Sequence, residues 1–260
     1  MRILVTFAVD AEFAPWRERH KFATTPIELP DRYFKESFFT ATIGNTDVTV
    51  YLTGIGWTVA EYGLRMLFGR TLDVLVSSGL AGALKSEYAK GDVVAPRFVA
   101  SLYGEGAVGS NTSLLGLAQQ CGAKIAERCV TSRQILGQAQ FKRAMGEFAD
   151  IVDMESFKIM SMATGPQVRA ITVRAISDTV DEDMPIDFSR VLDQNGRVLV
   201  RQVALQLARY PHRLPALIRF GKESQKAATR LADFLDEYIP LVDAQMYEGI
   251  SKKREQVAAR

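Results

Sequence analysis

The sequence predicts a three-layer αβα sandwich with a central mixed sheet and a C-terminal helical extension. Short apolar runs rich in β-branched residues alternate along the chain with segments of helical periodicity, which is the pattern of an α/β domain. Two of the runs, Ile3–Val9 and Val74–Val76, are almost continuously apolar, as expected for strands covered on both faces. The last third of the chain is mostly helical in pattern, and this segment (197–240) is the predicted extension.

Each strand is predicted from an apolar run bounded by turn or polar residues, and these runs are Ile3–Val9, Val48–Leu52, Val74–Val76, Val93–Ala95 and Val168–Ile176. Apolar residues three and four apart predict helices over Val59–Phe68, Ser113–Gln119, Gln138–Phe148 and Met154–Met162. From Arg197 to Ile239 we expect two helices, because Pro211 and Pro215 end one and start the next. The second is expected over Pro215–Tyr238, with an interrupted apolar stripe.

The chain has 260 residues, of which 47% are hydrophobic and 24% charged, as in ordinary globular proteins. We expect a single domain over residues 1–250, because no repeat or low-complexity linker divides it. Residues 15–32 are polar, aromatic and interrupted by proline, and they read as an excursion after the first strand. Residues 251–260 lack an apolar stripe and are expected to be frayed or disordered.

Charge and composition exclude several classes of function. The net charge of +2 gives no sign of the excess positive charge that nucleic-acid binding requires. Cys121 and Cys129 are eight positions apart, and His20 and His212 have no ligand-spaced neighbour, so neither a metal site nor a cofactor is expected. No apolar run approaches the roughly 20 residues that span a bilayer, so no stable membrane insertion is expected. Few cysteines and no signal peptide favour a cytoplasmic location.

Two glycine-containing segments follow predicted strands. Gly54-Ile55-Gly56 lacks the third glycine of a dinucleotide-binding loop, because position 59 is Val59. It is therefore either a tight turn or a turn that lets the backbone approach a small ligand. The segment Ser77–Gly82 lies at the carboxyl end of a strand, where α/β sheets bind ligands, but no Lys-Ser/Thr pair makes it a phosphate loop. It is either a plain turn or the floor of a site.

Three carboxylates stand near ends of predicted elements. Glu12 follows the first strand and is either a solvated rim residue or a site residue. Glu155 begins a helical pattern, where acidic residues are common, but the adjacent Met154 would suit the apolar face of a ribose. Ser177 and Asp178 follow a buried strand, and Asp178 is either a cap or a general acid.

The sequence resembles the nucleoside phosphorylase superfamily, particularly the 5′-methylthioadenosine/S-adenosylhomocysteine nucleosidases. The resemblance covers roughly residues 1–190 and lies in six stretches that follow the family's order: ILVTFAVDAEF, LTGIGWTVAEYG, DVLVSSGLAGAL, GDVV, VDMES and VRAISD. It implies that Asp178 is the catalytic acid toward the purine base and that Ser177 orients it. It further implies that Glu155 and Met154 hold the ribose, that Glu12 activates water, and that a turn comprising Gly79, Leu80, Ala81 and Gly82 lines the cleft.

The sequence also departs from the family. Purine phosphorylases carry an arginine where this chain has Ser77, and the chain lacks a Pro-Gly-Asp-Pro phosphate loop, so water is favoured over phosphate as nucleophile. The nucleosidases have a serine where this chain has Leu80. Their adenine-stacking aromatic is expected near residues 132–137, where this chain offers Ile135 and Leu136 as base-pocket residues.

The predicted function is cleavage of the N-glycosidic bond of a purine nucleoside, by hydrolysis, with no cofactor and with an adenine-type, 5′-substituted substrate. The segments GLAGAL, DQNGR and PHRLPALIRFGKES resemble the hopanoid-associated phosphorylase-like proteins, which implies an adenosylhopane-type substrate and a sheltering role for the second C-terminal helix. Phosphorolysis is an alternative, in which Arg17, Arg19, Arg97 or an arginine of a neighbouring subunit binds phosphate. A non-catalytic nucleoside-binding protein is another. The family resemblance also implies a homo-oligomer.

Overall fold

The computed structural model describes residues 1–27, 36–56, 64, 72–163, 168–188, 191 and 199–258. The strands are β1 (Arg2–Phe7), β2 (Ala23–Ile27), β3 (Glu36–Ile43), β4 (Thr46–Leu52), β5 (Val74–Ala83), β6 (Val93–Ser101), β7 (Ala107–Gly109), β8 (Lys124–Thr131), β9 (Ile151–Asp153) and β10 (Arg169–Asp178). The helices are α1 (Asp10–Arg17), α3 (Thr112–Gln120), α4 (Ala139–Met145), α5 (Ser156–Met162), α6 (Val200–Arg209), the 3-10 turn η2 (Pro211–Arg213) and α7 (Leu214–Ala258).

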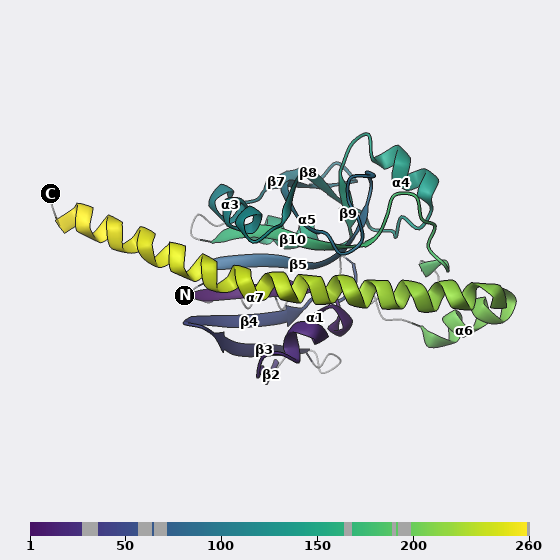
Figure 1. Ribbon diagram of the computed structural model, residues 1–260, viewed down its shortest axis with the longest axis horizontal. Coiled ribbons are helices and arrows are strands. Elements are labelled where there is room, and N and C mark those ends of the chain that lie inside the picture. Colours follow the sequence, from purple (N-terminus) through teal and green to yellow (C-terminus); the bar gives the residue numbers. More distant parts are fainter. Residues whose placement is uncertain are drawn as a thin grey trace.

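The sheet is mixed, as the sequence predicts. β1 pairs in parallel with β4 and β5, and β3 continues the sheet beyond β4 as an antiparallel neighbour. On the other side, β5, β10, β6, β8 and β9 pair in a ring, so this half of the sheet closes on itself. Figure 1 shows α7 crossing the whole sheet and extending beyond it at both ends.

Helices cover both faces of the sheet. On β1, the alternating side chains Ile3, Val5 and Phe7 pack in one core with residues of α1, α3 and α7. Leu4, between them, faces the opposite side and belongs to a second core with Ile159 of α5. The predicted three-layer αβα architecture with a C-terminal helical extension is therefore confirmed.

The strands and helices at several positions differ from the sequence predictions. The segment Ser77–Gly82, expected to be a turn, lies inside β5, because its backbone pairs with β10 as far as Gly82. Residues 10–17 form α1, although only an excursion was expected after β1. The strands β2, β3, β7, β8 and β9 were not predicted. β8 and β9 pair with β6 and β5 across longer stretches of chain, whereas β2, β3 and β7 pair with strands that are adjacent in the sequence. Strand formation depends on such neighbours more than on the intrinsic preference of a segment.

The C-terminal extension consists of α6, η2 and α7, with the break at Pro211 where the sequence predicts it. α7 continues past the expected end at Tyr238 to Ala258, and it therefore includes residues 251–258 of the segment 251–260 that was expected to be frayed or disordered. Lys, Arg, Glu and Gln in this stretch are good helix formers, and adding residues to an existing helix needs no new nucleation. The predicted helix over Val59–Phe68 and the DQNGR segment lie outside the described residues.

Among the described residues, no helix combines the length and the apolar character needed to cross a membrane. Cys121 is half-buried and Cys129 is buried.

Candidate active site

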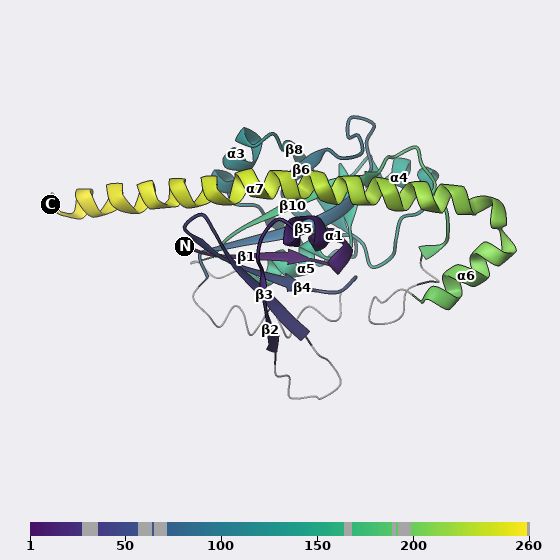
Figure 2. The same ribbon diagram turned by 60° about the horizontal axis from the view of Figure 1, so that its bottom comes forward.

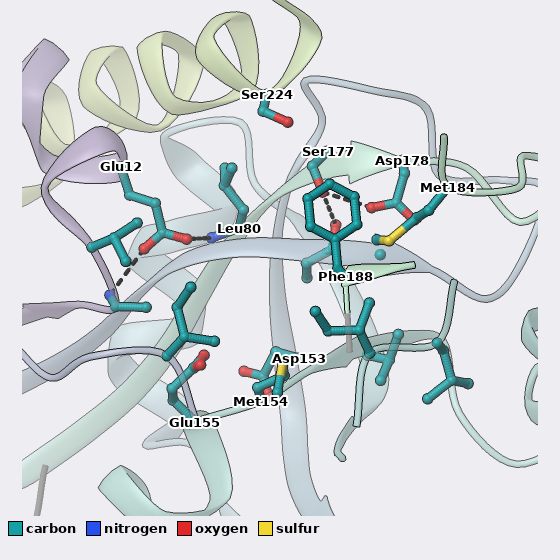
Figure 3. A pocket seen from close by; sticks show the side chains of 18 of the residues that line it. Glu12, Leu80, Asp153, Met154, Glu155, Ser177, Asp178, Met184, Phe188 and Ser224 are labelled. Atoms are coloured by element: carbon teal, nitrogen blue, oxygen red, sulfur yellow. Dashed lines mark hydrogen bonds between the residues drawn. The ribbon is translucent and has the colours of Figure 1, made fainter. Parts of the chain in front are cut away.

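One cavity of about 240 Å³ opens at the carboxyl ends of β1, β5 and β10. Glu12, Glu155 and Asp178 all line it, although they lie far apart in the sequence. Figure 3 shows the Glu12 and Glu155 side chains on one side of the cavity and Asp178 on the other, near Met184 and Phe188. The structure therefore places the three predicted site carboxylates around one shared space.

Glu12 is held at the first turn of α1, just after β1. Its carboxylate accepts hydrogen bonds from the backbone N–H of Ala8 at 2.9 Å and of Leu80 at 3.1 Å. Burial raises the pKa of Glu12 above its ordinary value, while the Arg174 charge and the backbone hydrogen bonds lower it in part. A carboxylate with a raised pKa is better matched to accept a proton near neutral pH than an ordinary exposed one.

Glu155 occupies the junction between β9 and α5. Its carboxylate accepts a hydrogen bond from the backbone N–H of Gly56 at 2.9 Å, and Gly56 has the positive φ of 86° that glycine adopts readily. The glycine turn after β4 therefore brings its backbone to the site, one of the two roles that the sequence left open. Met154, beside Glu155, also lines the cavity.

Burial raises the pKa of Glu155 to about 8, opposed by Arg174 and reinforced by the negative charges of Asp153 and Glu12. Burial is the largest cause, and Arg174 does not offset it because this cation is shared with the buried carboxylates of Asp153 and Glu12. Arg174 forms an ion pair with Asp153 at 2.8 Å and lies 4.0 Å from Glu155.

Arg174 was not recognised as a functional residue in the sequence. It is 1% exposed and projects from β10, where its guanidinium also donates to the Ser78 carbonyl at 2.9 Å and to Ser156 Oγ at 2.7 Å. A charged residue inside the apolar run Val173–Ile176 was the only signal for it.

Gly79 makes room for this guanidinium. A Cβ atom at Gly79 would lie 2.2 Å from Arg174 Nη1 and 3.1 Å from Glu12 Oε2, and the φ of 144° disfavours other residues. Gly79 therefore lies behind the cavity wall and is not among its lining residues, unlike Leu80, Ala81 and Gly82. The sequence analysis expected Gly79 to line the cleft, but its position beside Arg174 and Glu12 leaves it outside the residues that line the cavity.

Asp178 ends β10 after a register shift in the pairing with β5. Ile176 pairs with Ala81, but Asp178 pairs with Gly82, so Ser177 is the extra residue of a bulge. Bulges of this kind redirect side chains next to active sites. The Ser177 hydroxyl lies 2.7 Å from Asp178 Oδ1, consistent with the predicted orienting role.

Lys142 of α4 stands behind Asp178. The lysine side chain is fully buried, and its ammonium donates to Asp178 Oδ2 and to the carbonyls of Thr179 and Glu182, both at 3.0 Å. The sequence placed this residue in a predicted helix and gave no sign of a partner. With Ser177 on one oxygen and Lys142 on the other, the carboxyl group of Asp178 has a fixed orientation.

The remaining walls of the cavity are largely apolar. Ile135 and Leu136 line it, as the sequence predicts for the base pocket. Aromatic residues come from elsewhere, since Phe188 and Phe220 both line the cavity, with ring centroids 5.4 Å apart. Ser224, one turn after Phe220 on α7, also reaches it.

The three arginines considered for phosphate binding are engaged outside the cavity. Arg17 pairs with Asp10. Arg19 pairs with Asp233 at 2.7 Å and with Asp236 at 2.8 Å, and Arg97 lies 3.6 Å from Glu127. None of the described residues that line the cavity is a lysine or an arginine.

Residues 2–111 match the model of the phosphorylase superfamily. Over these residues the chain is similar to the phosphorylase superfamily. Over 175 residues, which are 58% of this chain and 76% of the relative, it is 27% identical to a 5′-methylthioadenosine/S-adenosylhomocysteine nucleosidase of Glaesserella parasuis.

Several solved structures share the fold of this chain at low sequence identity. A Campylobacter jejuni 5′-methylthioadenosine/S-adenosylhomocysteine nucleosidase superposes with a TM-score of 0.67 at 18% identity, covering 92% of this chain and 98% of that one. A Helicobacter pylori futalosine hydrolase superposes with a TM-score of 0.67 at 17% identity, covering 92% and 97%.

The raised pKa of Glu155 predicts a pH-dependent stability. The folded state binds the Glu155 proton more tightly than the unfolded state, so this contribution is complete below pH 4.5 and is lost as pH rises through about 8. We expect the melting temperature of the wild type to fall further between pH 5 and 9 than that of Glu155→Gln, by at least about 2–4 °C, the equivalent of 1 kcal/mol at this chain length. Replacing the exposed Glu18 by Gln is the control, and equal pH slopes in all three proteins would contradict the raised pKa of Glu155.

We expect removal of the Lys142 ammonium to cause a large loss of stability. Lys142→Met leaves the buried Asp178 without its cation, so we expect the free energy of unfolding to fall by about 3–5 kcal/mol. The control is Lys124→Met, which removes an exposed pair with Asp92 and should cost about 0–1 kcal/mol. Denaturant unfolding measures both, and similar losses would mean that Lys142 does not hold Asp178 as described.

Proposed function

We propose that this protein hydrolyses the N-glycosidic bond of a purine nucleoside. The single observation that carries the proposal is the shared cavity with Glu12 and Glu155 on one side and Asp178 on the other. Breaking this bond requires a proton on the departing base, a cradle for an oxocarbenium-like sugar and a nucleophile on the opposite face. Two separated carboxylates perform the same tasks in glycoside hydrolysis.

Each side chain has a role that follows from its place. Asp178, held by Ser177 and Lys142, donates a proton to the base as the bond to the sugar breaks. Because Asp178 is ion-paired with the Lys142 ammonium, the proton that it passes to the base comes from that ammonium through their hydrogen bond, and the resulting neutral Lys142 amine takes up a proton from solvent before the next turnover. Glu155 binds the ribose hydroxyls, and Met154 packs on the apolar face of the sugar. Glu12 accepts a proton from the water that attacks the anomeric carbon.

The charges around the cavity favour water over phosphate. A phosphate dianion next to Glu12 would meet the carboxylates of Glu12 and Glu155, and the described lining contributes no lysine or arginine to bind it. Arg174 is already engaged by Asp153, Ser156 and the Ser78 carbonyl. Phosphorolysis would need an arginine from a second subunit of an oligomer.

The apolar walls favour an adenine-type nucleoside with an apolar 5′ substituent. Phe188 lies beside Asp178 and supplies the aromatic surface that the sequence lacked near residues 132–137. Phe220 places the first turns of α7 at the cavity, which supports the expected sheltering role of this helix. The resemblance to hopanoid-associated proteins makes an adenosylhopane-type molecule the finer prediction.

The reaction is tested by base release, measured by chromatography and mass spectrometry, with and without phosphate. The substrates are adenosine, 5′-methylthioadenosine, S-adenosylhomocysteine and a long-chain 5′-alkylthioadenosine. We expect free base and free sugar without phosphate, with kcat/KM highest for the alkyl derivative. Asp178→Asn should lower kcat by about 10²–10⁴-fold, the usual contribution of general acid catalysis, while nucleoside binding persists. Strict dependence on phosphate would support phosphorolysis, and tight binding without turnover would support a non-catalytic binding protein.

We expect replacement of Phe188 to affect substrate binding more than the chemical step. Stacking on a base contributes about 1–3 kcal/mol, so Phe188→Ala should raise KM about tenfold or more and change kcat much less. Phe148→Ala removes an exposed ring of the segment after α4 that does not line the cavity, and it is the matched control. A Phe188→Ala enzyme with unchanged KM would place the base elsewhere in the cavity.

A further inference from the structure

The corner formed by α6, η2 and the first turns of α7 projects from the rest of the molecule. We call residues 199–226 the helical corner. Figures 1 and 2 show α6 displaced beyond the end of the sheet, with α7 leading back from the corner to the core. α6 is tied to the body through Gln206, whose side chain donates to the Asp187 carbonyl at 2.9 Å and accepts from the Asp187 N–H at 3.0 Å.

The helical corner exposes large apolar side chains. Ten such side chains are exposed among the described residues, and five of them fall in this short segment: Leu199, Leu205, Tyr210, Leu214 and Ile218. Leu205 and Ile218 are each more than half exposed, at 53% and 52%. Scattered exposed apolar residues are normal, but a gathering of them marks an interaction surface.

The same segment has a larger net positive charge than the whole chain. It contains six basic side chains (Arg201, Arg209, Arg213, Arg219, Lys222 and Lys226) and one acidic residue, Glu223, which pairs with Lys90 at 2.8 Å. Its net charge is therefore +5. Because the whole chain carries +2, all other residues together carry −3. The net charge of the whole chain does not show this asymmetry, which appears only when the charges of residues 199–226 are counted separately.

Two arginines lie against the exposed Tyr210 ring of the corner. The guanidinium carbon of Arg213 lies 4.9 Å from the centroid of the Tyr210 ring, and that of Arg209 lies 5.8 Å from it. Basic side chains around exposed Leu, Ile and Tyr side chains are typical of helices that lie in the interface of an anionic bilayer. A nucleic acid would engage the charges but leave the apolar side chains unexplained.

We propose that the helical corner docks this protein on the surface of an anionic phospholipid bilayer. The apolar side chains enter the headgroup region, and the arginines and lysines contact phosphate groups. α6 has only ten residues, so it lies in the plane of the interface and does not cross it.

The corner also leads toward the active site. A surface groove of about 520 Å³ runs along the start of α7 and is lined by Leu214, Ile218, Arg219 and Lys222. Arg219 also lines a smaller hollow of about 140 Å³, and that hollow shares Phe220, Met184 and Asp178 with the active-site cavity. Docking of the corner therefore places the bilayer next to a row of hollows that ends at the proposed catalytic acid.

The proposal is tested by sedimentation of the full-length protein with vesicles. We expect binding to vesicles of phosphatidylglycerol and phosphatidylcholine, little binding to pure phosphatidylcholine, and loss of binding at high salt. Each basic residue near an anionic surface contributes about 1 kcal/mol, so Arg209→Glu with Arg213→Glu should weaken binding at least about tenfold. Leu205→Ser with Leu214→Ser should weaken it without changing the salt dependence.

The controls use equally exposed residues away from the corner. Arg97→Glu with Phe148→Ser changes a charge and an apolar surface side chain elsewhere, and it should bind vesicles like the wild type. Because vesicle binding is measured without any nucleoside, failure of the proposed hydrolysis would not affect this test. Equal binding to neutral vesicles, no binding to anionic ones, or corner variants as tight as the control would overturn the proposal. Corner variants that change the molar mass of the protein in light scattering but bind vesicles as before would also overturn the proposal, because a second copy of the chain would then cover the corner.

Discussion

The guanidinium of Arg174 supplies the positive charge, among the described residues, in a region where Glu12, Asp153 and Glu155 would place three negative ones. Its position depends on Gly79, since any side chain there would collide with it, and on the small residues Ser77 and Ser156, whose hydroxyls accept its hydrogen bonds. Ser77 stands where purine phosphorylases of the resembled superfamily carry arginine. Here the cation, Arg174, comes from the neighbouring strand β10, and it interacts with the buried carboxylates and does not line the cavity.

This arrangement gives the cavity two chemically different ends. At one end, burial raises the pKa values of Glu12 and Glu155, and the negative charges of Asp153 and Glu12 raise that of Glu155 further. The raised pKa of Glu12 suits a group that accepts a proton near neutral pH. At the other end, Asp178 has its own buried cation in Lys142. A bulge at Ser177 turns Asp178 toward the cavity, and Gly82 leaves room for it, because a Cβ atom there would lie 3.0 Å from Asp178 Oδ2.

The helix α7 combines packing with access to the site. Its middle part packs against the sheet through fully buried residues such as Leu231, Leu235 and Ile239. Its first turns bring Phe220 and Ser224 to the cavity and Ile218 to the solvent. Because α7 is one continuous helix, it fixes the distances between the core, the cavity wall and the exposed helical corner.

The sequence by itself determined the layer architecture, because apolar runs and helical periodicity are local signals. It also determined which carboxylates, Glu12, Glu155 and Asp178, belong to one site, through the order of the stretches that resemble the superfamily. Only the tertiary structure decided that Ser77–Gly82 is a strand, that Arg174 and Lys142 are the counter-ions, and that Phe188 is the aromatic wall. Arg174 meets Ser78 across 96 positions and Lys142 meets Asp178 across 36, and side-chain spacing along a chain carries no information about partners so far apart.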